Sequence, residues 1–288
     1  MSTIHRVVDT HANIGEGPLW HPDEQRLYWV DIPTGHLYRY DPGEDEYELA
    51  YETDGPPLGG FTIEDDGALL LFTHGRVHRW VPGPKTSSVV VELAAETRFN
   101  DVIVDPDGRV FCGTMPGEEL GDLYRLDPDG TATIVVEDVD VSNGMGFSPD
   151  RETFYVTESE TRTIHAFDYD RATGELSNQR PFVETPAEDG VPDGMTVDAD
   201  GYVWSARWNG GRVVRYDPDG TPVAAFDVPA RKVSSVTFGG PAYRDLYVTT
   251  ALTGADRSTE GDGAGALFRI SDVGVSGVPE YRSSIASR

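Results

Sequence analysis

One position in the chain, just ahead of an alternating run of residues, carries polar side chains again and again. Asp193 lies there, between Pro192 and Gly194 and directly before the run MTVDADG. Similar runs give Asp193 five counterparts: Glu16 in GEGPLW, Gly59 in LGGFTI, Asn100 in FNDVIV, Asn143 in SNGMGF and Ser234 in VSSVTF. Carboxylate and carboxamide oxygens that face one point make an oxygen-rich cage, which suits a divalent cation such as Ca²⁺, Mg²⁺ or Mn²⁺. The repeated position is therefore a candidate metal site, provided that the fold brings its copies together.

These residues also have a purely structural interpretation. Asn and Asp beside glycine often stabilise a turn by hydrogen-bonding to their own backbone, and for any one copy that is the simpler explanation. Four polar residues at the same repeat position favour a shared site instead: Glu16, Asn100, Asn143 and Asp193. Arg98, two residues before Asn100, would add a permanent cation that holds a substrate oxygen or stabilises negative charge. A surface salt bridge explains Arg98 equally well.

Two strand patterns alternate along the chain and predict how these residues are positioned. The first is a strand, a turn and a second strand, as in NDVIVDPDGRVFCGT, and the second is a short strand that ends in an Asp/Pro/Gly turn, as in VVRYDPDG. Copies of the second pattern recur at intervals of roughly 40 to 54 residues, beginning at Leu37, Val77, Leu123, Ile164, Val213 and Leu267. That interval is the size of a four-stranded propeller blade. We therefore predict an all-β fold, a six-bladed β-propeller with four-stranded antiparallel blades, as a single domain over residues 1–288.

A propeller would turn the repeat into a ring. The first strand of each blade lines the central channel, so equivalent residues at the start of these strands surround one mouth of the channel. Glu16, Asn100, Asn143 and Asp193 would then face a common axis. We also expect the opening strand IHRVVDT to complete the sheet of the last unit, LFRISDVG, which would hold the two termini together.

The composition limits the possible partners. A formal net charge of -27 and a pI near 4.4 count against nucleic acid and anionic membranes, since both need a basic surface. Lys85 and Lys232 are the only lysines, and such an acidic, lysine-poor surface tolerates strong salt, which screens its self-repulsion. The sequence MSTIHRVVD lacks a signal-peptide core, and no apolar run approaches the roughly 20 residues of a membrane span. We expect a cytoplasmic, salt-adapted protein, either a monomer or a small homo-oligomer.

Several other motifs resemble sites but have simpler explanations. Cys112 is the sole cysteine and lies in the apolar run VFCG, so a buried hydrophobic role is favoured over a nucleophile. DPDG and DADG turns mimic the start of an EF-hand loop, but none continues to the required Glu; they begin at Asp105, Asp127, Asp198 and Asp217. His74 and His78 lie in a strand pattern broken by Gly75, so they are not expected to share a ligand face.

The ordered set of motifs resembles a known family. GEGPLW, RFNDVIVDPDGRVFCGTM, VSNGMGFSPD, VPDGMTVDADGYVW, NGGRVVRYDPDG and VTFGG look like the senescence marker protein 30/gluconolactonase family of six-bladed propellers, over nearly the whole chain. The resemblance implies a metal-dependent lactonase, with the metal ligands at Glu16, Asn143 and Asp193. It also implies substrate contacts from Arg98, Asn100 and Glu118. The segment from Pro116 to Asp122 is shorter than in animal relatives, so the lid beside Glu118 departs from the family pattern.

The implied reaction is hydrolysis of an aldono-1,4- or 1,5-lactone, such as a glucono-, xylono- or arabinonolactone, to the aldonic acid. One divalent ion, Ca²⁺, Mg²⁺, Mn²⁺, Fe²⁺ or Zn²⁺, would polarise the carbonyl and lower the pKa of water. Asp193 is the predicted general base, while Arg98 and Asn100 position hydroxyl groups and stabilise the oxyanion. A pentonolactone is the favoured substrate. A phosphotriesterase or aryl esterase using the same metal centre, and a non-enzymatic binding platform, remain alternatives.

Overall fold

Each repeat unit of the sequence folds into one antiparallel sheet of four strands, in a computed structural model that describes residues 2–93 and 98–285. Blade 1 comprises β2 (Gly15–His21), β3 (Arg26–Asp31), β4 (His36–Asp41) and β5 (Glu46–Glu52). Blade 2 comprises β6 (Gly60–Ile63), β7 (Leu69–Phe72), β8 (Arg76–Val81) and β9 (Thr86–Glu92). Blade 3 comprises β10 (Phe99–Val104), β11 (Val110–Thr114), β12 (Gly121–Leu126) and β13 (Ala132–Val139).

The remaining blades complete the ring. Blade 4 comprises β14 (Ser142–Phe147), β15 (Thr153–Glu158), β16 (Thr163–Asp170) and β17 (Glu175–Glu184). Blade 5 comprises β18 (Val191–Val197), β19 (Val203–Trp208), β20 (Arg212–Tyr216) and β21 (Pro222–Asp227). Blade 6 comprises β22 (Val233–Gly239), β23 (Asp245–Thr250), β24 (Ala266–Ser271) and the N-terminal strand β1 (Thr3–Asp9). The predicted six-bladed β-propeller is confirmed.

Helical structure in the described residues is limited to short turns in the connecting loops. They are the 3₁₀ turns Ile32–Thr34 and Ala187–Asp189 and the four-residue helix α1, Arg257–Glu260. In this part of the chain, no helix has the length and apolar character needed to cross a membrane.

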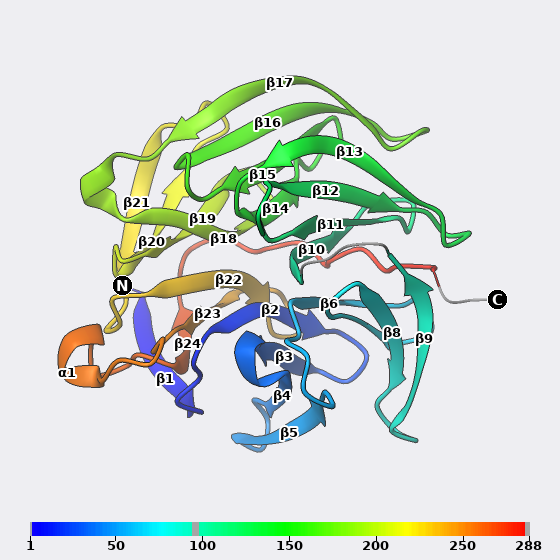
Figure 1. Cartoon of the computed structure of the whole chain (residues 1–288). Coiled ribbons are helices and arrows are strands. Elements are labelled where there is room, and N and C mark those ends of the chain that lie inside the picture. The colour runs from blue at the N-terminus through cyan, green and yellow to red at the C-terminus, as the bar shows by residue number, and fades with distance from the viewer. Residues whose placement is uncertain (1, 94–97, 286–288) are drawn as a thin grey trace.

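The first strand of every blade lies at the centre of the ring. β2, β6, β10, β14, β18 and β22 contact one another in succession, whereas β5, β9, β17 and β21 lie at the periphery (Figure 1). The residues of β14 and β22 are buried throughout, while those of β5 are mostly exposed. A strand packed on both faces loses the hydrophobic alternation of a half-exposed strand. Burial on both faces accounts for the missing alternation in SNGMGF of β14 and VSSVTFG of β22.

The ring closes through β1, as the sequence predicts. β1 pairs with β24, from Thr3 opposite Ser271 to Asp9 opposite Ala266, so the first and last parts of the chain share blade 6. β1 thereby supplies the fourth, outermost strand of blade 6, and the first segment of the chain holds the last blade in the ring.

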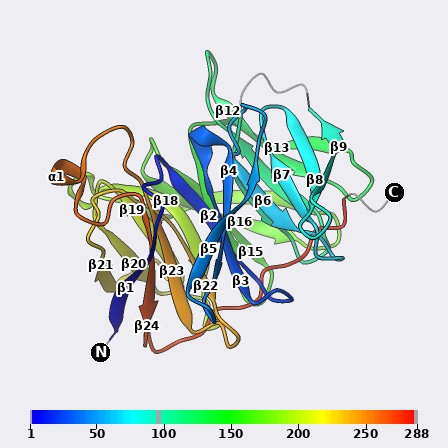
Figure 2. The ribbon, with the colours of Figure 1, turned by 90° about the horizontal axis from the view of Figure 1, so that it is seen from below.

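The expectation that closure holds the two termini together is wrong. After β24 the chain crosses the propeller: Ser276 accepts a hydrogen bond from Ala199 of blade 5, and Ser283 donates to Ile63 of blade 2. Figures 1 and 2 both place β1 and the last described residues on opposite sides of the molecule. The residues after β24 therefore act as a strap across the face opposite the starts of the inner strands, and backbone hydrogen bonds to several blades hold it there.

Hydrophobic clusters fill the interfaces between neighbouring blades. One cluster joins Tyr28 and Val30 of blade 1 to Phe61 and Leu69 of blade 2, and comparable clusters lie at the other interfaces. Cys112 is fully buried in the cluster between blades 2 and 3, as expected for a small apolar side chain. The core is thus a set of radial layers, each of which sets the angle between two blades.

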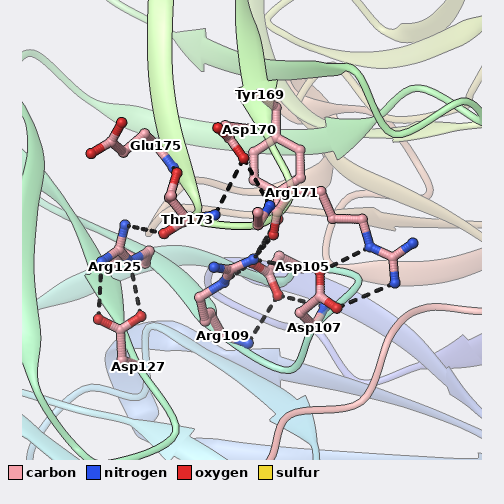
Figure 3. A network of polar contacts seen from close by, with 11 residues as sticks. Asp105, Asp107, Arg109, Arg125, Asp127, Tyr169, Asp170, Arg171, Thr173 and Glu175 are labelled. Carbon is pink, nitrogen blue, oxygen red and sulfur yellow. Dashed lines mark hydrogen bonds and ion pairs between the residues drawn. The ribbon is translucent and has the colours of Figure 1, made fainter.

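The DPDG and DADG motifs are hairpin turns, as predicted. The Asp105 carboxylate accepts backbone hydrogen bonds from Asp107 (2.8 Å) and Arg109 (2.9 Å), and its second oxygen accepts one from the Tyr169 hydroxyl (2.7 Å). Arg109 contacts both Asp105 and Tyr169, while Arg171 forms an outer pair with Asp107 (Figure 3). The turn of blade 3 is therefore connected to the β16–β17 turn of blade 4 by a buried polar network.

This network predicts a difference between two aspartates of one turn. Asp105 is fully buried against the buried Arg109, so Asp105→Ala leaves a guanidinium without its counter-charge and should lower the free energy of unfolding by about 3–5 kcal/mol. The control is Asp107→Ala, whose exposed carboxylate pairs with Arg171 and, at 3.5 Å, with Arg109; because Arg109 keeps Asp105, the denaturation midpoint should be nearly unchanged. Chemical denaturation of both variants measures the difference. Equal effects would contradict the assignment.

Candidate functional site

A cavity of about 340 Å³ opens at one mouth of the central channel, and the starts of the inner strands form its floor. Blades 1, 3, 4 and 5 each contribute lining residues from two places: the start of the first strand and the end of the second strand. Antiparallel pairing places these positions side by side, for example Ser142 opposite Glu158 and Val191 opposite Trp208. The lining residues are Ile14, Glu16, Ile32, Arg98, Asn100, Met115, Val141, Asn143, Ser159, Glu160, Val191, Asp193, Trp208 and Asn209.

Only four of the six equivalent positions in the predicted ring line the cavity. Glu16, Asn100, Asn143 and Asp193 line the cavity, and each is at most 6% exposed. The other two copies, Gly59 and Ser234, do not line it: Gly59 has no side chain, and the Ser234 hydroxyl donates to the Gly15 carbonyl and contacts Thr249. The repeat therefore provides six equivalent positions, of which four present polar side chains to one space.

Irregular strand pairing aims these side chains. The register between the first and second strands shifts beside each polar copy, between Glu16 and Leu19, between Phe99 and Val102, between Asn143 and Met145, and between Pro192 and Met195. A bulge of this kind bends a strand and redirects a side chain. In blade 2, where Gly59 takes the same position, β6 and β7 pair without a shift. Blade 6 has such a shift as well, between Val233 and Ser235, although Ser234 does not line the cavity. A bulge therefore accompanies every copy of the repeat position that carries a side chain.

A chain of hydrogen bonds crosses blades 3, 4 and 5 beneath the cavity. Arg98 donates through Nη1 to the Asn100 side-chain oxygen (2.8 Å), and the Asn100 amide donates to the Ser142 carbonyl (2.8 Å) and to Asn143 Oδ1 (3.2 Å). The Asn143 amide donates in turn to Ser159 Oγ (2.9 Å). Each carboxamide therefore has a defined orientation, and Asn143 keeps a lone pair of Oδ1 for a ligand.

Ser159 completes this chain of hydrogen bonds. Its hydroxyl accepts from the Asn143 amide and donates to the Pro192 carbonyl (2.8 Å), one residue before Asp193. Ser159 thus ties the position of Asn143 to the strand that carries Asp193. A residue that orients a metal-coordinating side chain by a hydrogen bond strengthens metal binding without contacting the ion itself.

The floor of the cavity concentrates negative charge in a buried place. Burial raises the pKa of Glu16 well above its usual range, and the charges of Asp193 and Asp101 raise it further. Burial, followed by the charge of Asp101, likewise raises the pKa of Asp193. Burial raises the pKa of Asp101 itself to about 7, against the opposing effect of Arg98. A nearby cation would relieve this repulsion. Arg98 and the fully buried Arg207 offset only part of the negative charge.

The donor chemistry at the floor fits a hard divalent cation. Glu16 and Asp193 supply carboxylate oxygens and Asn143 a carboxamide oxygen, which are the ligands that such ions prefer. Within residues 2–93 and 98–285, no cluster of three or more His, Cys, Asp and Glu side chains could hold a metal ion. The predicted set contains only two such residues, because its third ligand is an asparagine.

The remaining predicted residues differ in their position. Arg98 and Asn100 line the cavity with the three predicted ligands. Glu118 lies exposed in the loop between β11 and β12 and is not among the lining residues, whereas Met115 of the same loop is. A substrate contact from Glu118 stays a prediction that needs this loop to fold over the cavity.

The sequence reasoning did not identify several residues at this site. Asp101 faces the channel below the cavity although strand alternation would separate it from Asn100, and Ser159, Trp208 and Asn209 form part of the wall. A usable signal existed for the wall residues, because each follows or ends the second strand of its blade. No comparable signal existed for Asp101, since its position depends on the bulge between Phe99 and Val102.

Comparisons with known proteins agree on one family. Residues 14–252 match the family model described as the SMP-30/gluconolactonase/LRE-like region. The pentonolactonase of Haloferax volcanii is 54% identical over 98% of this chain and 99% of that protein.

Two solved structures extend the similarity. A calcium-binding protein, regucalcin, from Agrobacterium tumefaciens superposes with a TM-score of 0.90 at 25% identity, covering 96% of both chains. A gluconolactonase from Xanthomonas campestris superposes with a TM-score of 0.78 at 25% identity, covering 94% of this chain and 89% of that one.

The buried carboxyl groups predict a particular pH dependence in the presence of EDTA. Asp101 has a pKa of about 7 in the folded protein and near 3.8 in the unfolded chain, so the folded state binds the proton more tightly. Its contribution is present below pH 4 and is lost as the pH rises through 7, at most about 4 kcal/mol. The midpoint temperature of unfolding should therefore decrease as the pH is raised from 5 to 8, and excess divalent cation should reverse this decrease.

Asp101→Asn provides the control for this prediction, since it removes the carboxyl group and keeps the shape. Thermal unfolding of this variant in EDTA should depend less on pH than that of the parent protein. Identical pH slopes for the two proteins, or a parent midpoint that rises from pH 5 to 8, would count against the charge assignment.

Proposed function

The chain belongs to the SMP-30/gluconolactonase/LRE-like family, and on that premise we propose that it is a metal-dependent sugar lactonase, a carboxylic-ester hydrolase. The observation that carries the proposal is the convergence of Glu16, Asn143 and Asp193 on the floor of one cavity, with Arg98 and Asn100 beside them. An oxygen-donor set with excess negative charge suits a cation, and the neighbouring donors suit a polar substrate.

The relatives support both halves of the proposal. The Haloferax protein is named a pentonolactonase and is identical at more than half of the aligned positions, which favours a pentonolactone as the substrate. The Xanthomonas protein is described as a gluconolactonase and the Agrobacterium protein as calcium-binding. We accordingly propose an aldonolactone substrate, with a five-carbon lactone preferred, and one bound divalent cation held by Glu16, Asn143 and Asp193.

When bound, a divalent cation supplies Lewis-acid polarisation of the lactone carbonyl and a lower pKa for water. The protein residues perform the remaining work. Asp193, whose pKa is raised by burial, accepts a proton from the attacking water as general base. Arg98 uses Nη1 for Phe99 and Asn100, which leaves its other donors for the substrate oxygen on which negative charge develops. Asn100 is held by Arg98 and Asn143 and helps to position the sugar hydroxyl groups.

The acidic surface is part of the same proposal. The chain carries 50 Asp and Glu against 23 Lys and Arg, and its outer strands, such as β5 with Glu46 and Glu48, expose many of the acidic groups. Similarity to a Haloferax protein over nearly the whole chain supports adaptation to strong salt. Salt screens the mutual repulsion of such a surface.

Asp193→Asn is the direct test of the reaction. It keeps the shape of the side chain but removes the base and one anionic ligand, so hydrolysis should fall at least ~10³-fold while the fold is retained. Release of acid from pentono- and hexonolactones, followed in a pH-stat with and without EDTA, measures the loss and the metal requirement. Asp200→Asn is the matched control, because Asp200 is exposed in the turn at the other end of β18.

The same assay distinguishes the alternative substrates. A phosphotriester and an aryl ester belong in the panel because the same cation and oxygen donors suit their hydrolysis. Full activity of Asp193→Asn would exclude Asp193 as the base. If the metal-loaded parent protein released no acid from any lactone above background, the lactonase proposal itself would be wrong.

Ser159→Ala tests the support of the predicted ligand Asn143. Loss of the hydroxyl removes an acceptor for the Asn143 amide and a donor to Pro192, so divalent-ion affinity should fall about 10-fold to 100-fold. Isothermal titration with Ca²⁺ and Mn²⁺ measures it. Ser142→Ala is the matched control: this buried hydroxyl has no hydrogen-bond partner in the described part of the chain, and its removal should leave affinity unchanged. Equal affinities for the two variants would refute the orienting role of Ser159.

A further inference from the structure

One wall of the cavity is formed by an unusual tryptophan. Trp208, the last residue of β19, is the one aromatic side chain among the described residues that line the cavity. The chain has five tryptophans, and the other four are at most 3% exposed: Trp20, Trp29, Trp80 and Trp204. Trp208 is only partly buried. Its ring is therefore available to a ligand, in contrast to the tryptophans of the core.

The backbone around Trp208 is tightly packed. Asn209 takes a left-handed conformation (φ 61°), and Gly210 donates a backbone hydrogen bond to Arg207 (3.1 Å). A Cβ atom at Gly190 would lie 2.6 Å from the Trp208 carbonyl oxygen and 2.6 Å from the Gly210 nitrogen, so the two segments touch. Such packing fixes the place from which the indole ring projects.

A charged pair lies close to the ring. Lys232, one of only two lysines, places its ammonium 5.8 Å from the centroid of the Trp208 ring. The same ammonium lies 2.7 Å from a carboxylate oxygen of Glu260, and the two side chains are only 12% and 6% exposed. The Glu260 carbonyl also accepts a backbone hydrogen bond from Arg231 (2.7 Å). A largely desolvated ammonium on an aromatic ring is a significant contact, and here it connects the ring to helix α1.

We propose that Trp208, positioned by Lys232 and Glu260, is the wall against which the ring of the lactone packs, and that this contact sets the affinity for cyclic sugar substrates. The inference rests on the proposed function, which it extends by naming a binding surface opposite the polar floor. Trp208 would touch the substrate, while Lys232 and Glu260 are positioning residues that act through it.

The chemistry of a sugar lactone suits this arrangement. Such a ring has a polar rim of hydroxyl and carbonyl oxygens and a face of C–H bonds. The negative face of an aromatic ring attracts the weakly positive hydrogens of such a surface, while burial of both faces removes apolar area from water. The oxygens can then turn toward Arg98, Asn100 and the predicted cation on the floor. An open-chain polyol has no comparable flat face, so this wall favours the ring form.

Tryptophan emission provides a test that does not depend on turnover. Titration of the parent protein with a 1,4-anhydropentitol, a five-membered sugar ring without the reactive carbonyl, should change the emission, whereas an open-chain pentitol should change it at least about fivefold less. Because the other four tryptophans are buried, Trp208→Phe should abolish the change. An unchanged response in Trp208→Phe, or equal responses to ring and open chain in the parent protein, would overturn the proposal.

Steady-state hydrolysis tests the same contact in the substrate. Trp208→Leu should raise KM for the lactone about 10-fold with kcat changed less than about twofold, because the wall binds the ground state and the transition state alike. Trp208→Phe keeps an aromatic face and should recover most of the loss. Lys232→Met should raise KM about threefold through a displaced ring, and Lys85→Met, which alters the exposed second lysine, should behave like the parent protein.

The outcomes separate this inference from the proposed function. If the parent protein hydrolyses lactones but the KM of Trp208→Leu stays within twofold of the parent value, the proposed contact between Trp208 and the lactone is wrong and the lactonase assignment stands. A fall in kcat of Trp208→Leu without a rise in KM would also refute the proposed contact. If the parent protein hydrolyses no lactone, the proposed function fails, and the emission titration with the ring analogue then decides alone whether Trp208 forms a sugar-binding wall.

Discussion

The repulsion between buried carboxylates is the constraint on which the centre of this protein depends. Glu16 and Asp193 come from blades 1 and 5, and both are nearly inaccessible to water. Their raised pKa values express the cost of holding like charges in a place with little solvent. Such an arrangement persists only when the surrounding structure enforces it. A propeller can do so, because each blade is held by its neighbours on both sides and cannot turn a single charged strand away.

The scaffold around these charges combines regularly paired strand segments with bulges at the starts of the inner strands. The first two strands of each blade pair without a register shift near the hairpin turn that joins them, and the Asp105 network connects blades 3 and 4 on this side. At the opposite ends of the inner strands, bulges beside Asn100, Asn143 and Asp193 interrupt the pairing. Strand bulges cost local hydrogen bonds, but they direct side chains to a common point. The regular half of the molecule therefore stabilises the irregular half.

The cavity combines two different surfaces. Its floor is polar and is ordered by the hydrogen bonds that run from Arg98 through Asn143 to Ser159. Its wall includes Trp208, whose ring lies close to the Lys232 ammonium. A polar floor and an apolar wall suit a ligand with a hydroxyl-rich rim and a C–H face. The protein is strongly acidic as a whole, and Arg98 is the one cationic side chain among the described residues that line the cavity.

Much of the fold and part of the candidate site follow from the sequence alone. The six copies of the repeat determined the number of blades, and the repeat position determined which residues surround the channel mouth, because every blade enters the ring in the same way. The same repeat marks the ends of the second strands, where Ser159 and Trp208 line the cavity. Only the tertiary structure decided that Asp101 faces the channel. It also decided that the C-terminal segment crosses the propeller instead of meeting the N-terminus. Period-2 alternation describes one strand at a time, whereas bulges and contacts between blades depend on residues far away in the sequence, which a local pattern cannot encode.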